Sequence, residues 1–253
     1  KDGYVDIDKL KEIKKINSNL YWFDMRDSAG TTQFEVLPFV KKYIKKSFYK
    51  NKSLYLKQLE GGRFYTDFYI KKYLIKDNPK YESKVLDKKF ISKLTLGWNI
   101  GVAFFFDHLN YSLFSYYEEL INFKLFKKKK FKMKLGNHVS WENDHNKYDA
   151  LCLMNTRFAR NSVGFQRKLL NENLSKLSKL NLLYDVRLNK KNYYKNLRNS
   201  KVSIGAFGWG EVCYREFEAI RSGVAFLFPN MSNIETWPNI YIENETYVSY
   251  NYD

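Results

Sequence analysis

The stretch that decides the fold is residues 201–230, KVSIGAFGWGEVCYREFEAIRSGVAFLFPN. The apolar run at 202–206 predicts a short strand, and the GWG sequence at 208–210 predicts a tight loop whose backbone can approach a ligand closely. Residues 211–222 fit a helix that stops at a glycine, and residues 224–228 predict a second buried strand. A strand that leads through a glycine loop into a helix presents unpaired N–H groups and the positive end of the helix dipole. This segment therefore favours an anionic ligand.

The glycine loop and the helix after it carry the predicted ligand contacts. Gly208 and Gly210 would offer main-chain N–H groups to a diphosphate, and Arg215 would reach the same phosphates from early in the helix. Glu211, Arg215 and Glu218 are spaced by four and three residues, which places them on one face of the predicted helix. The alternative is that the segment only closes a helix onto a sheet and binds nothing.

The same residues resemble a known family. Residues 207–223 are similar to the donor-binding part of GT-B glycosyltransferases, where a glycine loop and a helix ending in E-A-x-x-x-G hold a nucleotide-sugar. The run at 207–219 also resembles the FGWGE-x-C-[YW]-R-[DE]-F-E-A pattern of poorly characterised surface-glycan transferases. The resemblance implies that Glu218 accepts hydrogen bonds from ribose hydroxyls. The family often carries two glutamates eight residues apart, whereas Glu211 and Glu218 are seven apart.

The composition predicts an anionic partner. The chain has 44 lysines and arginines against 27 aspartates and glutamates, a formal net charge of +17. Such a charge favours nucleotides, acidic lipid, polyanionic glycan or nucleic acid as partners. The alternative is that the lysines simply fill exposed positions. Seven of the nine arginines follow residue 150, and arginine makes bidentate phosphate contacts that lysine cannot make. We therefore expect the second half of the chain to handle phosphate.

The second half alternates strands and helices, as is typical of a parallel, doubly wound sheet. The predicted elements are strands at 148–154, 182–186, 202–206 and 224–228 and helices at 161–177, 193–199 and 211–222. Ligands of such sheets bind beyond the carboxyl ends of the strands. This rule places Arg157, in the loop after the first of these strands, near the glycine loop as a further donor-binding residue.

The whole chain is expected to form an α/β protein of two domains. The predicted domains are residues 1–143, on the acceptor side, and residues 144–253, which bind the nucleotide-sugar. With the resemblance, they imply a GT-B-like arrangement of two Rossmann-type domains whose parallel sheets face each other across a cleft. The predicted elements of the first half are strands at 19–25, 53–57 and 93–98 and a helix at 33–49, with a polar linker at 136–147.

The two ends of the chain also bear on the resemblance. The first residue is Lys1 rather than Met, which is consistent with a trimmed N-terminus. The sequence ends at Asp253 without the final helix that GT-B proteins usually send back to the first domain. We expect either a truncated chain or a departure from the family.

The first half is expected to supply the catalytic base. Asp27 follows the first predicted strand, where it would take the proton from an acceptor hydroxyl; its alternative role is that of a helix N-cap. No histidine or cysteine set has metal-ligand spacing. The one Asp-x-Asp pair, Asp6 and Asp8, lies at the N-terminal end, unlike the pair of the metal-dependent GT-A fold. We expect metal-independent catalysis, no cofactor and a nucleotide-sugar as donor substrate.

The expected function is transfer of a sugar from that donor to a hydroxyl of a surface glycan or glycolipid. Unpaired cysteines and the lack of an apolar run long enough to span a bilayer predict a cytoplasmic location. The lysine run at 127–130, beside aromatic residues, predicts peripheral contact with an acidic membrane at its inner face, or else a solvated helix end.

Two other functions stay open. One is a basic nucleic-acid-binding protein, although the sequence carries no recognisable nucleic-acid-binding motif, which makes nucleic acid the weaker expectation. The other is a non-catalytic GT-B-like scaffold that binds glycans.

Overall fold

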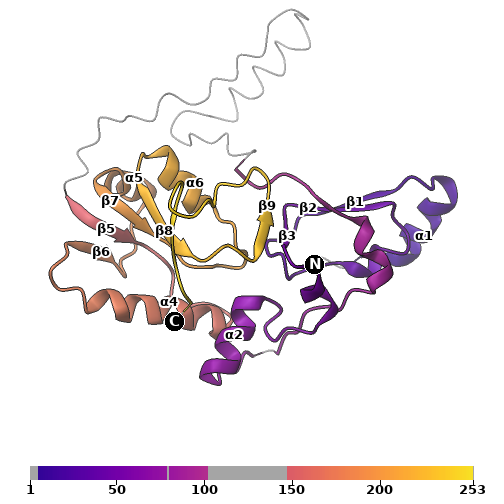
Figure 1. Ribbon diagram of the computed structural model, residues 1–253, viewed down its shortest axis with the longest axis horizontal. Coiled ribbons are helices and arrows are strands. Elements are labelled where there is room, and N and C mark those ends of the chain that lie inside the picture. Colours follow the sequence, from indigo (N-terminus) through magenta and orange to yellow (C-terminus); the bar gives the residue numbers. More distant parts are fainter. Residues whose placement is uncertain (1–4, 79, 102–146, 253) are drawn as a thin grey trace, which may run out of the picture.

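The fold is built on two parallel sheets. The computed structural model describes residues 5–78, 80–101 and 147–252. Within them, a three-stranded sheet forms in the first half, a five-stranded sheet in the second half, and a two-stranded antiparallel pair links the two (Figure 1). The chain is therefore a mixed α/β protein with parallel sheets, as predicted. The linker predicted at 136–147, apart from its last residue, and the lysine run at 127–130 lie outside the described residues.

The first-half sheet has the strand order β1-β2-β4, and both of its pairings are parallel. Its strands are β1 (Tyr21–Asp24), β2 (Lys42–Lys45) and β4 (Leu94–Leu96). The strands predicted at 19–25 and 93–98 are confirmed, because they contain β1 and β4.

The helix predicted at 33–49 is wrong, since β2 lies inside it. Side chains of β2 alternate between half-buried and buried, which is the two-residue period of a strand. That period is hard to see in the sequence because one of its two buried side chains is Lys45, which forms an ion pair with the fully buried Asp24 at 2.9 Å. The pair is tolerated because further hydrogen bonds satisfy it: Tyr43 donates to Asp24, and Lys45 donates to a main-chain carbonyl oxygen.

The strand predicted at 53–57 is also wrong, because η2 (Lys52–Leu56) is a 3₁₀ helix. The side chain of Asn51 accepts from Ser53 N and so starts the helical turn. The other first-half elements are α1 (Ile7–Ile16), η1 (Phe34–Val36), β3 (Ser47–Tyr49), α2 (Phe64–Tyr73) and η3 (Lys88–Lys93).

The second-half sheet has the strand order β10-β8-β7-β5-β6 and is entirely parallel. Its strands are β5 (Tyr148–Cys152), β6 (Leu182–Tyr184), β7 (Ser200–Ile204), β8 (Ala225–Pro229) and β10 (Val248–Tyr250). Its helices are α4 (Asn161–Ser175), α5 (Lys190–Arg198) and α6 (Tyr214–Arg221). All four strands and three helices predicted for this region are confirmed, although α6 begins three residues later than expected.

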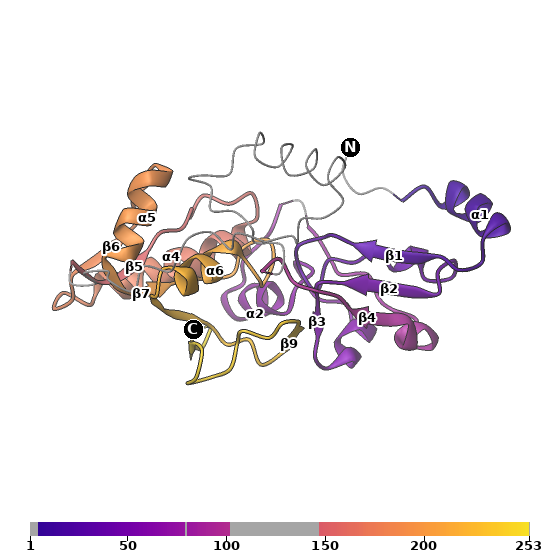
Figure 2. The same ribbon diagram turned by 90° about the horizontal axis from the view of Figure 1, so that it is seen from above.

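Helices cover both faces of this sheet. α4 lies on one side, where its Leu174 packs against Ala150 and Cys152, while α5 and α6 lie on the other (Figures 1 and 2). The helices lie on opposite faces because the order of the strands reverses at β5. The chain passes from β5 to β6 on one side of it, and then crosses back over β5 to reach β7 on the other side. The connections that follow β5 and β7 therefore leave neighbouring strands toward opposite faces.

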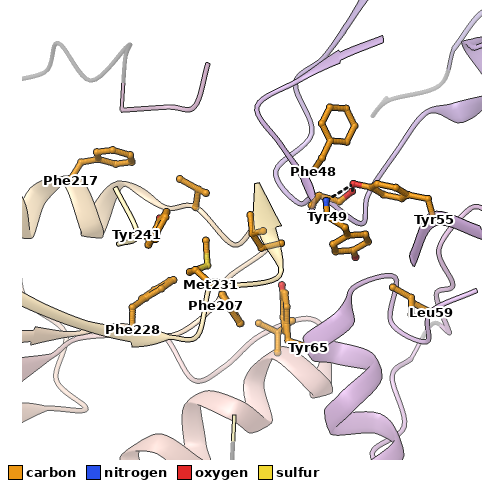
Figure 3. Close-up of a cluster of buried hydrophobic side chains, with 14 of the residues drawn as sticks. Phe48, Tyr49, Tyr55, Leu59, Tyr65, Phe207, Phe217, Phe228, Met231 and Tyr241 are labelled. Carbon is orange, nitrogen blue, oxygen red and sulfur yellow. Dashed lines mark hydrogen bonds between the residues drawn. The ribbon is translucent and has the colours of Figure 1, made fainter. Parts of the chain in front are cut away.

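The two halves share one buried core. β3 pairs antiparallel with β9 (Ile234–Thr236), and aromatic side chains from both halves meet beside this pair (Figure 3). The rings of Tyr65 and Phe207 are 4.5 Å apart between centroids, and Phe207 packs edge-on against Phe228 at 5.5 Å. Because aromatic contacts bury large areas, this cluster holds the first half against the loop that follows β7.

Gly210 brings the main chains of the two halves close together. A Cβ added there would lie 2.3 Å from the carbonyl oxygen of Asp27. We expect Gly210→Ala to lower the free energy of unfolding by roughly 1–3 kcal/mol, because the backbone must move to admit the methyl group. Urea denaturation measures the change. Gly208→Ala is the matched control, since the nearest atom to its added methyl group is a side-chain nitrogen of Arg167, at 3.2 Å, rather than main chain. Equal losses in the two variants would contradict this close approach.

Candidate functional site

The candidate site lies at the carboxyl edge of the five-stranded sheet, between β5 and β7. Connections leave these adjacent strands toward opposite faces, and open α/β sheets bind ligands at such a switch point. Residues 153–160 follow β5 and residues 205–213 follow β7. Two loops predicted separately to bind the donor therefore end side by side, since β5 and β7 are paired along their length.

Glu211 joins the glycine loop to the first half of the chain. Its carboxylate is fully buried and accepts hydrogen bonds from Ser28 Oγ at 2.7 Å and from the main-chain N–H of Ala29 at 2.9 Å. Glu211 precedes α6 rather than lying in it, so the prediction that it shares a helix face with Arg215 and Glu218 is wrong. α6 starts later because Glu216 accepts from Cys213 N and caps the helix there.

The two residues before Gly210 are also held from the first half. Tyr65 donates its hydroxyl hydrogen to the carbonyl oxygen of Gly208 at 2.7 Å, and Arg63 donates from Nε to the carbonyl oxygen of Trp209 at 2.7 Å. Both donor side chains are buried. The carbonyl groups of the loop are thus taken up by protein donors, and the conformation of the loop is fixed before any ligand binds.

Two arginines of the second half, the buried Arg167 and the half-buried Arg215, hold the loops of the switch point in place. Arg167 donates to the carbonyl oxygens of Asn155 at 2.8 Å and Phe207 at 3.1 Å, and so ties the two loops together. Arg215 donates to the carbonyl oxygen of Ala206 at 3.1 Å. Burial, followed by the nearby positive charge of Arg215, lowers the pKa of Arg167 to about 10. Arg215, predicted to contact phosphate, thus lies at the predicted edge with its guanidinium directed to main-chain oxygens.

Glu218, the predicted ribose contact, faces α5. Its two carboxylate oxygens accept hydrogen bonds from the hydroxyls of Tyr193 and Tyr194, both at 2.8 Å. The negative charge of Glu218 and burial together raise the pKa of Tyr193, with burial the larger cause. A ribose bound here would compete with these tyrosines or share the carboxylate oxygens with them.

Arg157 and Asp27 offer exposed side chains at the site. Arg157 lies in the loop after β5, and its side chain forms no hydrogen bond or ion pair with the residues that the structure describes. Asp27, the predicted base, directs a largely exposed carboxylate to Lys46 Nζ at 3.0 Å. No helix starts at Asp27, so its alternative role as an N-cap is wrong. Its main chain touches Gly210, so the structure brings the predicted base and the predicted donor loop together.

Arg160 lies close to Arg157 in the sequence and Arg63 follows the Gly61-Gly62 pair, and the structure brings both arginines to Trp209 of the glycine loop. The guanidinium carbons of Arg63 and Arg160 lie 5.5 and 5.2 Å from the centroid of the Trp209 ring. Trp209 lies between the two glycines of the loop. The neighbouring glycines are therefore the sequence feature that indicates the positions of Arg63 and Trp209. No pattern in the sequence indicates that the two arginines meet.

Glu216 is a buried acid just below the glycine loop. Its Oε2 accepts from Cys213 N at 2.6 Å, whereas Oε1 has no hydrogen-bond partner among the described residues. The hydroxyl of Tyr241 is likewise buried and unpartnered within the described part of the chain, and the negative charge of Glu216 adds to burial in raising the Tyr241 pKa. Burial raises the pKa of Glu216 to about 7.

A scan against protein-family models, a search of curated proteins and a search of solved structures found no match. Across residues 5–78, 80–101 and 147–252, no helix is long and apolar enough to cross a membrane, and no group of three or more His, Cys, Asp or Glu side chains could hold a metal ion. The Asp-x-Asp pair belongs to α1, where Asp6 caps the helix and Asp8 pairs with Lys11.

Glu216 predicts how stability depends on pH. Since the folded-state pKa is about 7 and the usual value is 4.5, the folded protein holds the proton in this window while the unfolded chain releases it. The free energy of unfolding should therefore fall as the pH rises from about 5 to 8, by up to about 3 kcal/mol. Glu216→Gln should remove this contribution and keep an acceptor for Cys213 N.

The measurement is urea denaturation of both proteins at several pH values. The difference between the wild-type and Glu216→Gln curves reports this residue alone, because the other titrating groups are common to both. Parallel curves across the window would show that Glu216 is not a strained buried acid.

Proposed function

We propose that the chain is a metal-independent glycosyltransferase of GT-B type, which moves a sugar from a nucleotide-sugar to a hydroxyl of a surface glycan or glycolipid. The observation that carries the proposal is the contact between Gly210 and the main chain of Asp27. The sequence predicted one as part of the donor site and the other as the base on the acceptor side. They come together at the switch point of the five-stranded sheet, where α/β proteins bind ligands.

The donor would lie against the two loops at the carboxyl ends of β5 and β7. Arg157 has an exposed guanidinium on the first loop, and the second leads into the N-terminus of α6. Hydrogen-bond donors fixed in advance stabilise a leaving diphosphate without having to reorganise during the reaction. The glycine loop is already held by hydrogen bonds within the protein. Ser28 donates to Glu211, Arg63 donates to the carbonyl oxygen of Trp209, and Arg167 donates to that of Phe207, so the loop conformation does not depend on the donor.

The acceptor would approach Asp27 from the first half. In the reaction, the acceptor oxygen forms a bond to the anomeric carbon of the sugar, and its proton passes to the Asp27 carboxylate. The bond from that carbon to the diphosphate breaks, and the nucleoside diphosphate leaves with the electron pair. Lys46 Nζ lies 3.0 Å from the Asp27 carboxylate, so the two groups form an ion pair at this side of the site. The proposed location is the cytoplasm, with the acceptor lipid-linked or part of a growing glycan.

Ligand-induced stabilisation tests the donor class. The protein is heated in the presence of a panel of nucleoside diphosphates and nucleotide-sugars, and the unfolding temperature is recorded. One nucleoside diphosphate and its sugar conjugate should stabilise selectively, by about 2.7 kcal/mol at 100 times the dissociation constant. No shift with any of them, together with salt-sensitive binding to an oligonucleotide, would overturn the proposal in favour of a nucleic-acid-binding protein.

Substitution of the base tests the catalytic role. Asp27→Asn should reduce sugar transfer by roughly 10²–10⁴-fold, because the amide cannot accept the proton, while donor affinity stays the same. Asp149→Asn is the matched control, since Asp149 is a half-buried acid paired with Lys201 at the opposite, amino edge of the sheet. Full turnover in Asp27→Asn with the donor identified above would remove Asp27 from the mechanism.

A further inference from the structure

Two arginines, one from each half of the chain, converge on a single carbonyl oxygen. Arg63 and Arg160 both donate from Nη1 to the oxygen of Gly61, at 3.2 and 3.0 Å. Each arginine immediately precedes a helix, α2 for Arg63 and α4 for Arg160. Gly61 has a positive φ of 68°, so it turns the main chain in a conformation that suits glycine. The two arginines therefore meet at this oxygen because Gly61 holds the main chain in a left-handed conformation.

The two positive charges have no acidic partner at hand. Neither guanidinium forms an ion pair with any residue in the described part of the chain. Asp77 acts on Arg160 only through its charge, and its carboxylate oxygens accept from Ser162 N and Ser162 Oγ. Burial, and then the charge of Arg63, lower the pKa of Arg160. An oxyanion between the two groups would relieve this repulsion.

Aromatic rings pack against both guanidinium groups, and Arg160 keeps hydrogen-bond donors unused among the described residues. The guanidinium carbon of Arg160 lies 4.2 Å from the Tyr81 centroid and 5.2 Å from that of Trp209, which also packs 5.5 Å from Arg63. Stacking occupies the faces of a guanidinium and leaves its in-plane N–H groups to bind oxygen. Nε and Nη2 of Arg160 form no hydrogen bond with the described residues. Trp209 is 39% exposed, so the cluster reaches the surface.

We propose that Arg160, with the buried positive charge of Arg63 beside it, binds the diphosphate of the nucleotide-sugar, an inference that rests on the proposed transferase function. The pair adjoins the glycine loop, because Arg63 also holds the carbonyl oxygen of Trp209. Guanidinium groups bind phosphate oxygens through two parallel N–H groups, which gives both affinity and orientation. With Arg160 from one half and the charge of Arg63 from the other, both halves act on the donor diphosphate. Arg167 and Arg215 then act as positioning residues for the loops.

The test is a calorimetric titration with inorganic pyrophosphate at roughly 0.15 M ionic strength, where long-range attraction by the basic surface is screened. Arg160→Gln should weaken pyrophosphate binding by about tenfold or more. Arg198→Gln is the matched control, because it removes the same charge at the C-terminal end of α5, next to the start of β7 and hence at the amino edge of the sheet. It should change the affinity by less than about twofold.

A second variant and a tryptophan-fluorescence measurement distinguish weaker pyrophosphate binding from a folding defect. Arg160→Lys keeps the charge but lacks the planar guanidinium, and it too should weaken binding by about tenfold, with folding checked by urea denaturation. Pyrophosphate should change the tryptophan fluorescence of the wild-type protein, and Trp209→Phe should lose that change. Equal pyrophosphate affinity in the wild type, Arg160→Gln and Arg198→Gln would overturn the inference.

Competition separates the possible sources of the diphosphate. A nucleoside diphosphate should compete with pyrophosphate, and its own affinity should fall in Arg160→Gln. A nucleoside diphosphate that binds wild type and Arg160→Gln equally would overturn the inference while leaving the transferase function intact. Competition by a prenyl diphosphate alone would instead place a lipid-linked acceptor at the arginine pair and overturn its assignment to the donor.

Discussion

The buried carboxylate of Glu211 is the interaction on which the site depends. It belongs to the loop after β7, yet both of its hydrogen-bond donors, Ser28 Oγ and Ala29 N, belong to the first half. A buried charge is costly without such partners, so the loop adopts this conformation only when the first half is in place. The close approach of Gly210 to Asp27 follows from the same contact. A loop that the local sequence describes as a nucleotide-binding turn is thus completed by residues more than 180 positions away.

Arginine has two distinct roles around this loop. Arg167 and Arg215 are deeply placed and spend their N–H groups on main-chain carbonyl oxygens, which fixes the loops at the ends of β5 and β7. Arg160 stacks on Trp209 and Tyr81 and keeps Nε and Nη2 unused within the described part of the chain, beside the positive charge of Arg63. Preorganised cations of the second kind suit a diphosphate, because they need no rearrangement when its charge develops. The first kind supplies the rigidity that this preorganisation requires.

The sequence predicted the second half better than the first, for physical reasons. Residues 150–152 of β5 are buried in succession, and most of β8 is apolar and buried, so these strands can be recognised without knowledge of their neighbours. β2 was missed because its inward-facing Lys45 is compensated by Asp24, a partner 21 residues away. Glu211 was assigned to a helix because residue spacing alone cannot show that it lies before α6 and that its carboxylate accepts a hydrogen bond from Ser28. The arginine pair could not be predicted, since Arg63 and Arg160 meet only through the packing of α2 against α4.

The most direct measurement is a crystal structure of the full chain with the nucleoside diphosphate that stabilises it most. The account predicts phosphate density at the carboxyl ends of β5 and β7, between the loops at 153–160 and 205–213 and in contact with Arg160. Density at the amino edge of the sheet, or on the basic surface away from both loops, would contradict the assignment of this switch point as the donor site.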